Sequence, residues 1–557
     1  MKKYFSLITI LLFLINCKSQ NLNPTLQIDS KYESSKPKLV VGIVVDQMRY
    51  DYLSRFYSKF GEGGFKKLIS KGYNVKNAHF NFSATKTAVG HSSIHTGTTP
   101  VNHGILSNDW YDKSSKTYIN CVGDDRYKTV GTSSDNGQRS PSRLQTTTIS
   151  DQLHLAQNMN GKVIGMSSKD RGAILPVGHT ANAAYWYDGG DHGKFISSTY
   201  YLEKLPKWVL DFNNSGKAEN YISKPWDTYY NISTYTESIE DNNPYEQVLN
   251  GEKTPTFPHN IPELREKNDN YSIITETPFG NSLLTDLAIA SINGEQLGKS
   301  SFTDFLSISY SSTDYIGHGF GVVSKEIQDA YIRLDKDLER LLNFLDSDVG
   351  KENYTLFLTA DHGATHVPQY LIDNSIPANY FDGNKFKEYV KMVAMEKFGT
   401  KKLIENISNN TIYFDKTELN KLKIDQGIIQ QIIADEIINY DGIYKTVTAR
   451  TLQTTNFTEG ILSLIQNSYN QKLSGDVLYA YELSTISNWY ENKGGTTHGS
   501  GYNYNTHVPL LFYGKGIKNG ASNSYYHIID IAPTISTLLG IEFPNGNTGK
   551  AIEEVLK

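Results

Sequence analysis

A short strand-like run that ends in two metal-type ligands constrains this chain more than any other feature. Leu356, Phe357 and Leu358 form an apolar run typical of a buried strand, and Asp361 and His362 follow it closely. In an open α/β sheet, ligands bind at the carboxyl ends of the strands. The pair alone is more simply explained as a strand cap that starts a turn. Its weight comes from several other strand-like runs that end in the same way.

Composition is that of an ordinary globular protein. The 557 residues are enough for one main domain that carries insertions. A net charge of −5 leaves no basic stripe for nucleic acid. Hydrophobic residues make up 38% and aromatic residues 12%, which excludes a disordered chain. We therefore expect a folded protein without a nucleic-acid partner.

The N-terminus indicates export. A charged start and the apolar stretch Tyr4–Ile15 predict a signal peptide over residues 1–17, because a membrane span needs about 20 apolar residues. Cys17 ends a segment that resembles a lipoprotein cleavage box, although asparagine before the cysteine is atypical, so its lipidation is an open alternative. Residues 18–37 indicate a linker, and Cys121 remains alone, without a disulfide partner. We expect a protein of the periplasm, or anchored to the outer membrane, of a Gram-negative bacterium.

Other strand-like runs are followed or preceded by further metal-type ligands. Asp46 ends the β-branched run that begins at residue 38. Asp314 and His318 follow the run 304–310 in a glycine-containing turn, and two ligands four residues apart can hold one ion together. His498 stands before the strand-like run 508–513. An aspartate at such a position can also simply cap a turn.

Thr87 is the candidate nucleophile. A turn of small residues precedes a short helical segment, which places the Thr87 hydroxyl at a helix N-terminus, where anions are favoured. The simpler alternative is that Thr87 only caps the helix. Lys169 and Arg171 end another strand-like run; such cations are usually solvated, but arginine also binds phosphate with two parallel hydrogen bonds. Three nearby histidines are interpreted as packing or surface residues: His91, His95 and His103.

The alternation of elements predicts an α/β fold, with a mostly parallel central sheet flanked by helices. Residues 38–375 are interpreted as the first part of the catalytic domain, including long loops over residues 180–300. Residues 376–490 mix helical and strand-like runs and indicate a small α+β insertion. Residues 491–557 return to the main sheet and complete the catalytic domain.

The candidates form a set that is stronger than any member. Three histidines and three carboxylates without cysteine suit two zinc ions. The set is Asp46, Thr87, Asp314, His318, Asp361, His362 and His498. With its surroundings, the chain resembles the alkaline phosphatase superfamily, most closely the bacterial PafA-type alkaline phosphatases. The resemblance extends from about residue 38 to the end and rests on residues 44–49, 87–91, 104–110, 169–171, 312–318, 360–363, 496–498 and 530–534.

This resemblance implies roles for the set, with two Zn²⁺ per chain. One zinc ion would be held by Asp314, His318 and His498. The other would be held by the remaining ligands, which are Asp46, Asp361, His362 and the Thr87 oxygen. Zinc would lower the pKa of the Thr87 hydroxyl, so that Thr87 attacks phosphorus and forms a phosphothreonine that water then hydrolyses.

The resemblance also implies a substrate class. Asn108, Lys169 and Arg171 match residues that contact the nonbridging phosphate oxygens. A phosphate monoester is a dianion with three such oxygens, whereas a diester has two, so these donors favour small-molecule monoesters. We do not predict a third metal, because Lys169 can occupy the space where other superfamily members bind magnesium, and the sequence leaves that site undecided. Nothing in the sequence sets the oligomeric state, and a monomer is favoured.

Three alternative functions fit parts of the sequence less well. A phosphodiesterase or nucleotide pyrophosphatase of the same superfamily would share the zinc ions and the threonine, but Lys169 and Arg171 argue against it. A sulfatase needs a Cys or Ser in a Cys/Ser-x-Pro-x-Arg context, which the sequence around Thr87 lacks. A non-catalytic exported binding lipoprotein would not require both a full ligand set and a hydroxyl nucleophile.

Overall fold

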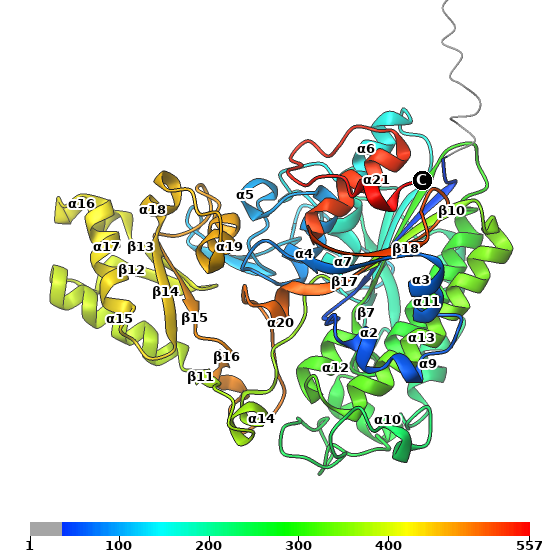
Figure 1. Cartoon of the computed structure of the whole chain (residues 1–557), viewed down its shortest axis with the longest axis horizontal. Coiled ribbons are helices and arrows are strands. Elements are labelled where there is room, and N and C mark those ends of the chain that lie inside the picture. The colour runs from blue at the N-terminus through cyan, green and yellow to red at the C-terminus, as the bar shows by residue number, and fades with distance from the viewer. Residues whose placement is uncertain (1–35) are drawn as a thin grey trace, which may run out of the picture.

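The computed structural model describes residues 36–557 and arranges them in a large main body and a smaller lobe (Figure 1). The expected signal peptide, Cys17 and all but the last two residues of the expected linker lie outside the described residues. Within residues 36–557, no helix combines the length and the apolar character that crossing a membrane requires.

Ten strands of the main body form one sheet in the order β18-β2-β17-β10-β1-β9-β6-β7-β8-β5. Their bounds are β1 (Leu39–Val45), β2 (Tyr73–His79), β5 (Thr129–Val130), β6 (Val163–Ser167), β7 (Ala183–Asp188), β8 (Lys194–Ser198), β9 (Asp304–Tyr310), β10 (Tyr354–Thr359), β17 (His507–Gly514) and β18 (Gly520–His527). Every residue of β1, β9 and β10 is buried, as the apolar runs predict for strands covered on both faces.

Strand directions explain how distant segments meet. The neighbours β10, β1, β9, β6 and β7 are parallel, and so are β18 and β2. Strand β17 is antiparallel to both β10 and β2. The amino end of β17 and the carboxyl end of β2 therefore lie at the same edge as the carboxyl ends of the parallel strands. The predicted mostly parallel sheet is confirmed.

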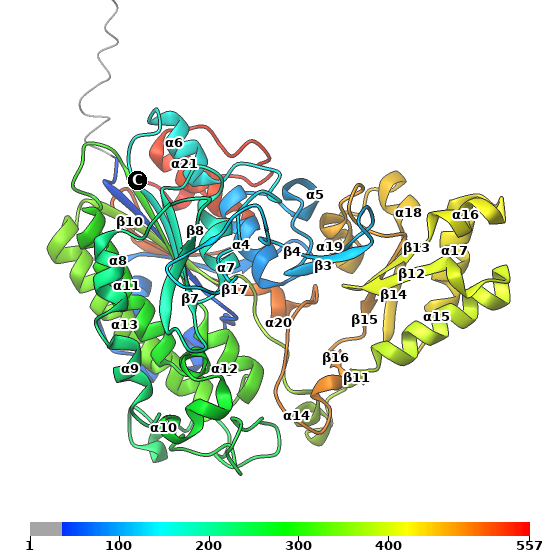
Figure 2. The same ribbon diagram turned by 180° about the vertical axis from the view of Figure 1, so that it is seen from behind.

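Two sets of helices cover the sheet (Figures 1 and 2). One set consists of α4 (Thr87–Thr96), α6 (Ile149–Ala156), α7 (Asp170–Ile174) and α21 (Ile531–Leu539). The other consists of α3 (Phe65–Lys71), α8 (Lys207–Asn213), α11 (Phe279–Glu295), α12 (Ser312–Phe320) and α13 (Lys325–Leu345). The apolar stripe of α13 is buried, and Ser324 caps its first turn by accepting a hydrogen bond from Ile327 N at 3.1 Å.

Two expectations about local structure were wrong. Residues 180–300 are more than long loops, because β7 and β8 join the main sheet and α11 packs against it. Helix α11 has few charges and is buried along most of its length, so it lacks the one-sided pattern that reveals a helix in sequence. Asp314 and His318 lie on helix α12 and not in a turn.

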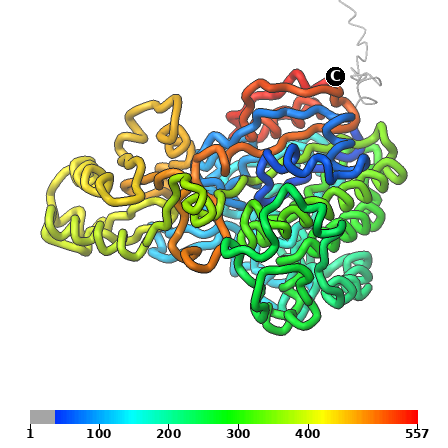
Figure 3. Tube along the Cα trace, turned by 60° about the horizontal axis from the view of Figure 1, so that its bottom comes forward, coloured from blue at the N-terminus to red at the C-terminus, as the bar shows by residue number. Residues whose placement is uncertain are grey.

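Residues 376–490 project from the main body, and we call them the insertion lobe (Figure 3). A sheet in the order β12-β13-β15-β14 forms its centre, and its domain boundaries stay a prediction. The strands are β12 (Ile404–Ser408), β13 (Thr411–Phe414), β14 (Ile443–Thr448) and β15 (Val477–Tyr481), with the pair β11 (Asn379–Phe381) and β16 (Thr485–Ser487) at the base. The helices are α15 (Gly383–Phe398), α16 (Lys416–Leu422), α17 (Gln426–Ile437), α18 (Ala449–Thr454) and α19 (Gly460–Ser468).

A hairpin of the main body lies against this lobe (Figure 2). It consists of β3 (Asp109–Asp112) and β4 (Thr117–Asn120). The ring of Tyr111 packs edge-on against Tyr413 of the lobe, with centroids 5.3 Å apart. The remaining short helices are α2 (Tyr52–Arg55), α5 (Pro100–His103), α9 (Lys217–Ile222), α10 (Ile261–Leu264), α14 (Pro368–Asp373) and α20 (Asn503–Thr506).

Candidate metal centre and active site

The candidate metal ligands come from segments that end or begin at one edge of the main sheet. Asp46, Asp314 and Asp361 follow the parallel neighbours β1, β9 and β10. His498 precedes β17 and Thr87 follows β2, and the antiparallel direction of β17 brings both to that same edge. The sheet topology therefore accounts for the meeting of residues that are hundreds of positions apart.

The candidate ligands form two groups, and within each group the ligand atoms all lie within 4.8 Å of one another. In the first, Asp314 Oδ1 is 3.2 Å from His318 Nε2 and 3.6 Å from His498 Nε2. The second consists of Asp46, Asp314 and His362, with His362 Nε2 at 3.4 Å from Asp46 Oδ1. Helix α12 places Asp314 and His318 on one face, one turn apart.

The second group differs from the set that the resemblance implied. Asp314 belongs to both groups, whereas Asp361 lies beside the second one. The Asp361 Oδ2 atom is 3.6 Å from His362 Nε2 and 3.3 Å from His91 Nδ1. Asp361 is nevertheless fully buried at the same centre.

The three histidines present the same ring atom to the cluster. His318 Nδ1 donates to the Thr496 carbonyl at 2.7 Å, and His498 Nδ1 donates to the Thr85 carbonyl at 2.7 Å. His362 Nδ1 donates to the Gly363 carbonyl at 3.0 Å. A backbone acceptor at Nδ1 leaves the Nε2 lone pair free, which is the tautomer that a metal requires.

Unpaired buried atoms and charge also fit divalent cations. Asp46 Oδ1, Asp361 Oδ2 and His362 Nε2 are buried and lack hydrogen-bond partners among the described residues. Buried polar atoms of this kind are costly unless a ligand satisfies them. Imidazole nitrogens and carboxylate oxygens without thiolates suit zinc, so the residues present fit the two ions that the resemblance implies.

The carboxylates influence one another strongly. Burial, followed by the charges of Asp314 and Asp361, raises the pKa of Asp46 well above its ordinary value. Burial opposes ionisation of Asp314 too, but His318 and Lys169 outweigh it and hold the pKa of Asp314 well below the ordinary value. Such an accumulation of negative charge in a buried site is costly, and bound metal cations would stabilise it.

Thr87 is the first residue of α4 and is 1% exposed. The simpler alternative, that Thr87 caps the helix, does not hold, because Lys86 occupies the N-cap position and no side chain caps there. The residues around Thr87 connect it to the first ligand group and to Asp361. Thr85 accepts the hydrogen bond from His498, and a Cβ at Gly90 would overlap the Asp361 backbone.

Of the three expected phosphate contacts, Asn108 touches the first turn of α4, whereas Lys169 precedes and Arg171 belongs to α7, which packs against α4. Asn108 Oδ1 accepts from the Ala88 N–H at 2.9 Å, and the amide nitrogen of Asn108 donates to no acceptor within residues 36–557. Lys169 Nζ lies 2.7 Å from Asp46 Oδ2 and 2.5 Å from Asp314 Oδ2. Burial lowers the pKa of Lys169, but these carboxylates outweigh burial and raise it, so the lysine stays charged.

Arg171 lies in the first turn of α7 and is held by its neighbour Asp170. The Asp170 Oδ1 atom accepts from the Arg171 N–H at 2.7 Å and lies 3.6 Å from Arg171 Nη1. Arg139 Nε in turn donates to Asp170 Oδ2 at 2.6 Å. The Arg171 Nε atom is buried and has no hydrogen-bond partner among residues 36–557.

Sequence reasoning missed two residues of the centre. His91 is fully buried, and besides Asp361 it contacts Ser309 Oγ at 2.8 Å, so it is not a surface residue. Gln47 donates from its backbone to Asp361 Oδ1 at 3.2 Å and from Nε2 to Asp314 Oδ1 at 2.6 Å. The spacing of His91, one helical turn after Thr87, was the available signal for the first; Gln47 had none beyond its position next to Asp46.

Proteins of known function are similar to this chain in sequence. The chain matches the family model described as type I phosphodiesterase / nucleotide pyrophosphatase over residues 40–453. It is 44% identical over 522 residues to alkaline phosphatase PafA from Elizabethkingia meningoseptica, covering 94% of this chain and 95% of that protein. It is 45% identical over 524 residues to alkaline phosphatase PhoV from Synechococcus elongatus, covering 94% of each.

The fold agrees with these matches. The crystal structure of wild-type alkaline phosphatase PafA aligns with a TM-score of 0.89 and 43% identity, covering 94% of this chain and 99% of that one. Identity of this level over nearly the whole of both chains confirms the family that the sequence motifs indicated. The chain therefore belongs to the alkaline phosphatase superfamily and, within it, to the PafA-type alkaline phosphatases.

Proposed function

We propose that this protein is a zinc-dependent phosphatase that hydrolyses small-molecule phosphate monoesters through a phosphothreonine at Thr87. The observation that carries the proposal is the position of Thr87. Thr87 is the first residue of helix α4. His498 hydrogen-bonds the carbonyl of Thr85, two residues before it, and Asp361 packs against Gly90 in the first turn of the helix. A hydroxyl so placed is suited to attack a bound phosphate.

The surrounding donors support a monoester substrate. The free amide of Asn108, the Lys169 ammonium and the Arg171 guanidinium are three groups for three nonbridging oxygens. Charge-assisted hydrogen bonds contribute about 1.5–3 kcal/mol each, and a dianion benefits more than a monoanion. In a diester, one of these oxygens carries a second ester group, which such a set would crowd.

The metal centre fits this chemistry. When bound, two zinc ions would supply positive charge for the attacking and leaving oxygens. The chain's own contribution is to fix the ligands: the three backbone carbonyls set the histidine tautomers, and Gln47 orients Asp314 and Asp361. Lys169 holds positive charge between Asp46 and Asp314.

The test compares two substrates on one zinc-loaded preparation at pH ~8. We expect kcat/KM for p-nitrophenyl phosphate to exceed that for its methyl diester by several orders of magnitude, and chelation to abolish both activities. Acid quenching during turnover, followed by peptide mass spectrometry, should find phosphate on Thr87. Phosphate on another residue would reject the nucleophile.

A phosphodiesterase is the second candidate, because the matching family model is named for that activity. The donors around Thr87 favour the monoesterase, and the same measurement separates the two. A preference for the diester would reject the monoesterase.

Export completes the proposal. The start of the sequence, with its charged residues and apolar stretch, supports a secreted enzyme, and Cys17 offers a possible site of lipid attachment. Labelling with a radioactive fatty acid in the native host would detect a lipid at Cys17, and Cys17→Ser should abolish the label.

A further inference from the structure

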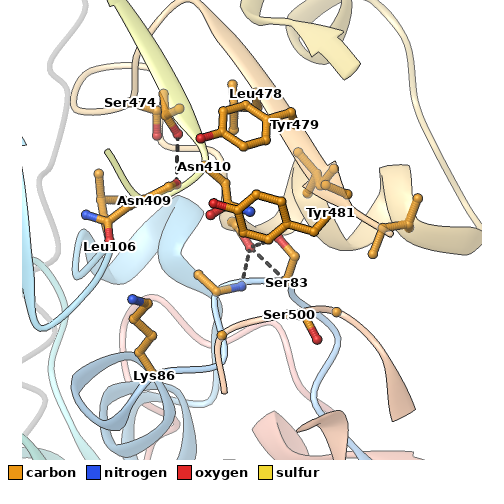
Figure 4. A pocket seen from close by; sticks show the side chains of 18 of the residues that line it. Ser83, Lys86, Leu106, Asn409, Asn410, Ser474, Leu478, Tyr479, Tyr481 and Ser500 are labelled. Atoms are coloured by element: carbon orange, nitrogen blue, oxygen red, sulfur yellow. Dashed lines mark hydrogen bonds between the residues drawn. The ribbon is translucent and has the colours of Figure 1, made fainter. Parts of the chain in front are cut away.

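A pocket lies between the main body and the insertion lobe (Figure 4). Main-body residues such as Ser83, Lys86 and Ser500 form one side, and lobe residues such as Tyr479 and Tyr481 form the other. Ser83 N donates to Ser468 Oγ of the lobe at 2.9 Å, which ties the two sides together. None of the residues assigned above to the metal centre or to phosphate lines this pocket.

The lining of the pocket nevertheless includes chain neighbours of three residues assigned to the active site. Lys86 precedes Thr87 in the chain, and Gly499 follows His498. Leu106 and Trp110 stand two residues before and after Asn108. Because consecutive Cα atoms are about 3.8 Å apart, these lining residues lie within a side-chain length of the nucleophile, a metal ligand and a phosphate donor.

The walls combine aromatic rings with unpaired donors. The rings come from Trp110, Tyr413, Tyr479, Tyr481 and Tyr502. The Trp110 indole N–H is buried without a partner in the described part of the chain. Figure 4 shows Lys86 below the two tyrosines of β15 with its nitrogen turned towards the lobe. No acceptor hydrogen-bonds that nitrogen among residues 36–557. Burial lowers the pKa of Lys86, and the charge of Asp109 only partly opposes this effect.

We propose that this pocket binds the ester group of the substrate and selects phosphate monoesters whose alcohol carries an aromatic ring with an anionic substituent. The inference rests on the proposed function and deepens it. A phosphate held by Asn108 and Arg171 beside Thr87 directs its ester group into adjacent space, and the pocket is the space that touches all three neighbouring segments. Aromatic walls bind a flat ring, and Lys86 and Trp110 supply donors for its polar substituent.

The test uses three alkyl monoesters: propyl phosphate, 3-phenylpropyl phosphate and 3-(4-carboxyphenyl)propyl phosphate. The ring is three carbons from the oxygen, so the leaving alcohols have nearly the same pKa and the ratio of kcat/KM values isolates binding of the ring. Burial of a phenyl group predicts a phenylpropyl to propyl ratio of about tenfold, and the carboxylate should raise kcat/KM further by a few fold.

Three variants test whether the pocket causes these ratios. Ile461→Ala, which shortens a half-buried lining residue on α19, should lower the phenylpropyl to propyl ratio several fold. Ile428→Ala, which makes the same change at a 53% exposed position on α17, should leave the ratio unchanged. Lys86→Met should remove the advantage of the carboxylate while keeping the advantage of the ring, and ratios cancel any effect of this change on the chemistry common to all three esters.

The outcomes separate the two proposals. Hydrolysis of propyl phosphate with a phenylpropyl ratio near one overturns the pocket and leaves the monoesterase intact. A phenylpropyl to propyl ratio that is unchanged in Ile461→Ala, or a carboxylate advantage that is unchanged in Lys86→Met, would also overturn it. Failure to hydrolyse any of the three monoesters, with turnover of the methyl diester, rejects the monoesterase and the pocket with it.

Discussion

Asn409 of the insertion lobe is hydrogen-bonded to the residues on both sides of Asn108 in the main body. Its Nδ2 donates to the Asp109 carbonyl at 2.9 Å, and its Oδ1 accepts from the Ser107 hydroxyl at 3.1 Å. The lobe therefore fixes the loop that carries Asn108, whose amide we propose binds phosphate. Asn409 has a φ of 49°, in the left-handed region that asparagine and glycine tolerate.

Asn409→Gly should lower kcat/KM for p-nitrophenyl phosphate about fivefold, because it removes both hydrogen bonds without straining the backbone. Combined with Asn108→Ala, it should cause little further loss, since the two side chains act on one contact. Lys423→Gly is the control, because Lys423 also has a positive φ, is exposed and lies elsewhere in the lobe. Additive losses in the double variant would contradict a role through Asn108.

Arg171→Ala should reduce monoester hydrolysis at least tenfold more than diester hydrolysis, because the guanidinium contacts charge that the diester lacks. Arg171→Lys should recover only part of the loss, since lysine cannot form two parallel bonds. The exposed Arg126, paired with Asp124, offers an Arg→Ala control in the same body. Equal losses for both substrates in kcat/KM measurements would remove the phosphate-binding role.

Thr87→Ala should lower activity by orders of magnitude while the chain still binds close to two zinc ions, because the Asp and His ligands remain. Thr87→Ser keeps a hydroxyl at the same helix start and should retain far more activity than the alanine variant. Metal content by elemental analysis and kcat/KM on the same samples provide the check. Zinc loss in parallel with activity would assign Thr87 to metal binding alone.

The sequence predicted the site best where a buried strand is followed directly by candidate ligands. The buried run 354–359 became β10, and the ligands after it, Asp361 and His362, lie at the metal centre. Runs that lack a clear period were missed, as with β7, whose sequence contains aromatic residues and no β-branched ones. Local patterns therefore located the strands that carry ligands better than the strands that complete the sheet.

Gly317 explains why the sequence predicts a turn where the structure has a helix. Glycine lowers helix propensity, so the stretch around Asp314 and His318 favoured a turn. In the structure, a Cβ at residue 317 would overlap the Gln47 side chain, and glycine permits this close approach inside α12. The contribution of Gln47, like that of Asn409, depends on contacts between segments far apart in sequence, which no local pattern encodes.

Chelation should destabilise the fold as well as inactivate the enzyme. Removing the ions leaves Asp46, Asp314 and Asp361 buried around one lysine, a costly accumulation of charge. Metal at about 1,000 times its Kd stabilises a folded chain by about 4 kcal/mol, so Tm should fall by several degrees with chelator. Added Zn²⁺ should restore it and Mg²⁺ should not, because imidazole ligands favour zinc. An unchanged Tm would mean that the fold does not depend on the metal.

The environment of Glu246, which is not one of the candidate site residues, predicts that the stability of the fold depends on pH. It is 7% exposed and accepts from Asn243 Nδ2 at 2.6 Å. Burial, followed by the charge of Glu326, raises its pKa from 4.5 to about 10. Between these values the unfolded chain has lost this proton while the folded chain keeps it. The free energy of unfolding contributed by Glu246 therefore falls as the pH rises through that window.

Glu246→Gln has no proton to lose and can still accept the hydrogen bond from Asn243. At pH 8 it should be more stable than the wild type by up to about 5 kcal/mol, at about 1.4 kcal/mol for each pH unit above 4.5, and the difference should vanish below about pH 3.5, where Glu246 is protonated in both the folded and the unfolded state. Chemical denaturation at several pH values measures this. Glu240→Gln, an exposed neighbour, should behave as wild type at every pH. A difference that does not grow between pH 5 and pH 8 would show that Glu246 is ionised in the folded protein, and that burial beside Glu326 does not keep its proton.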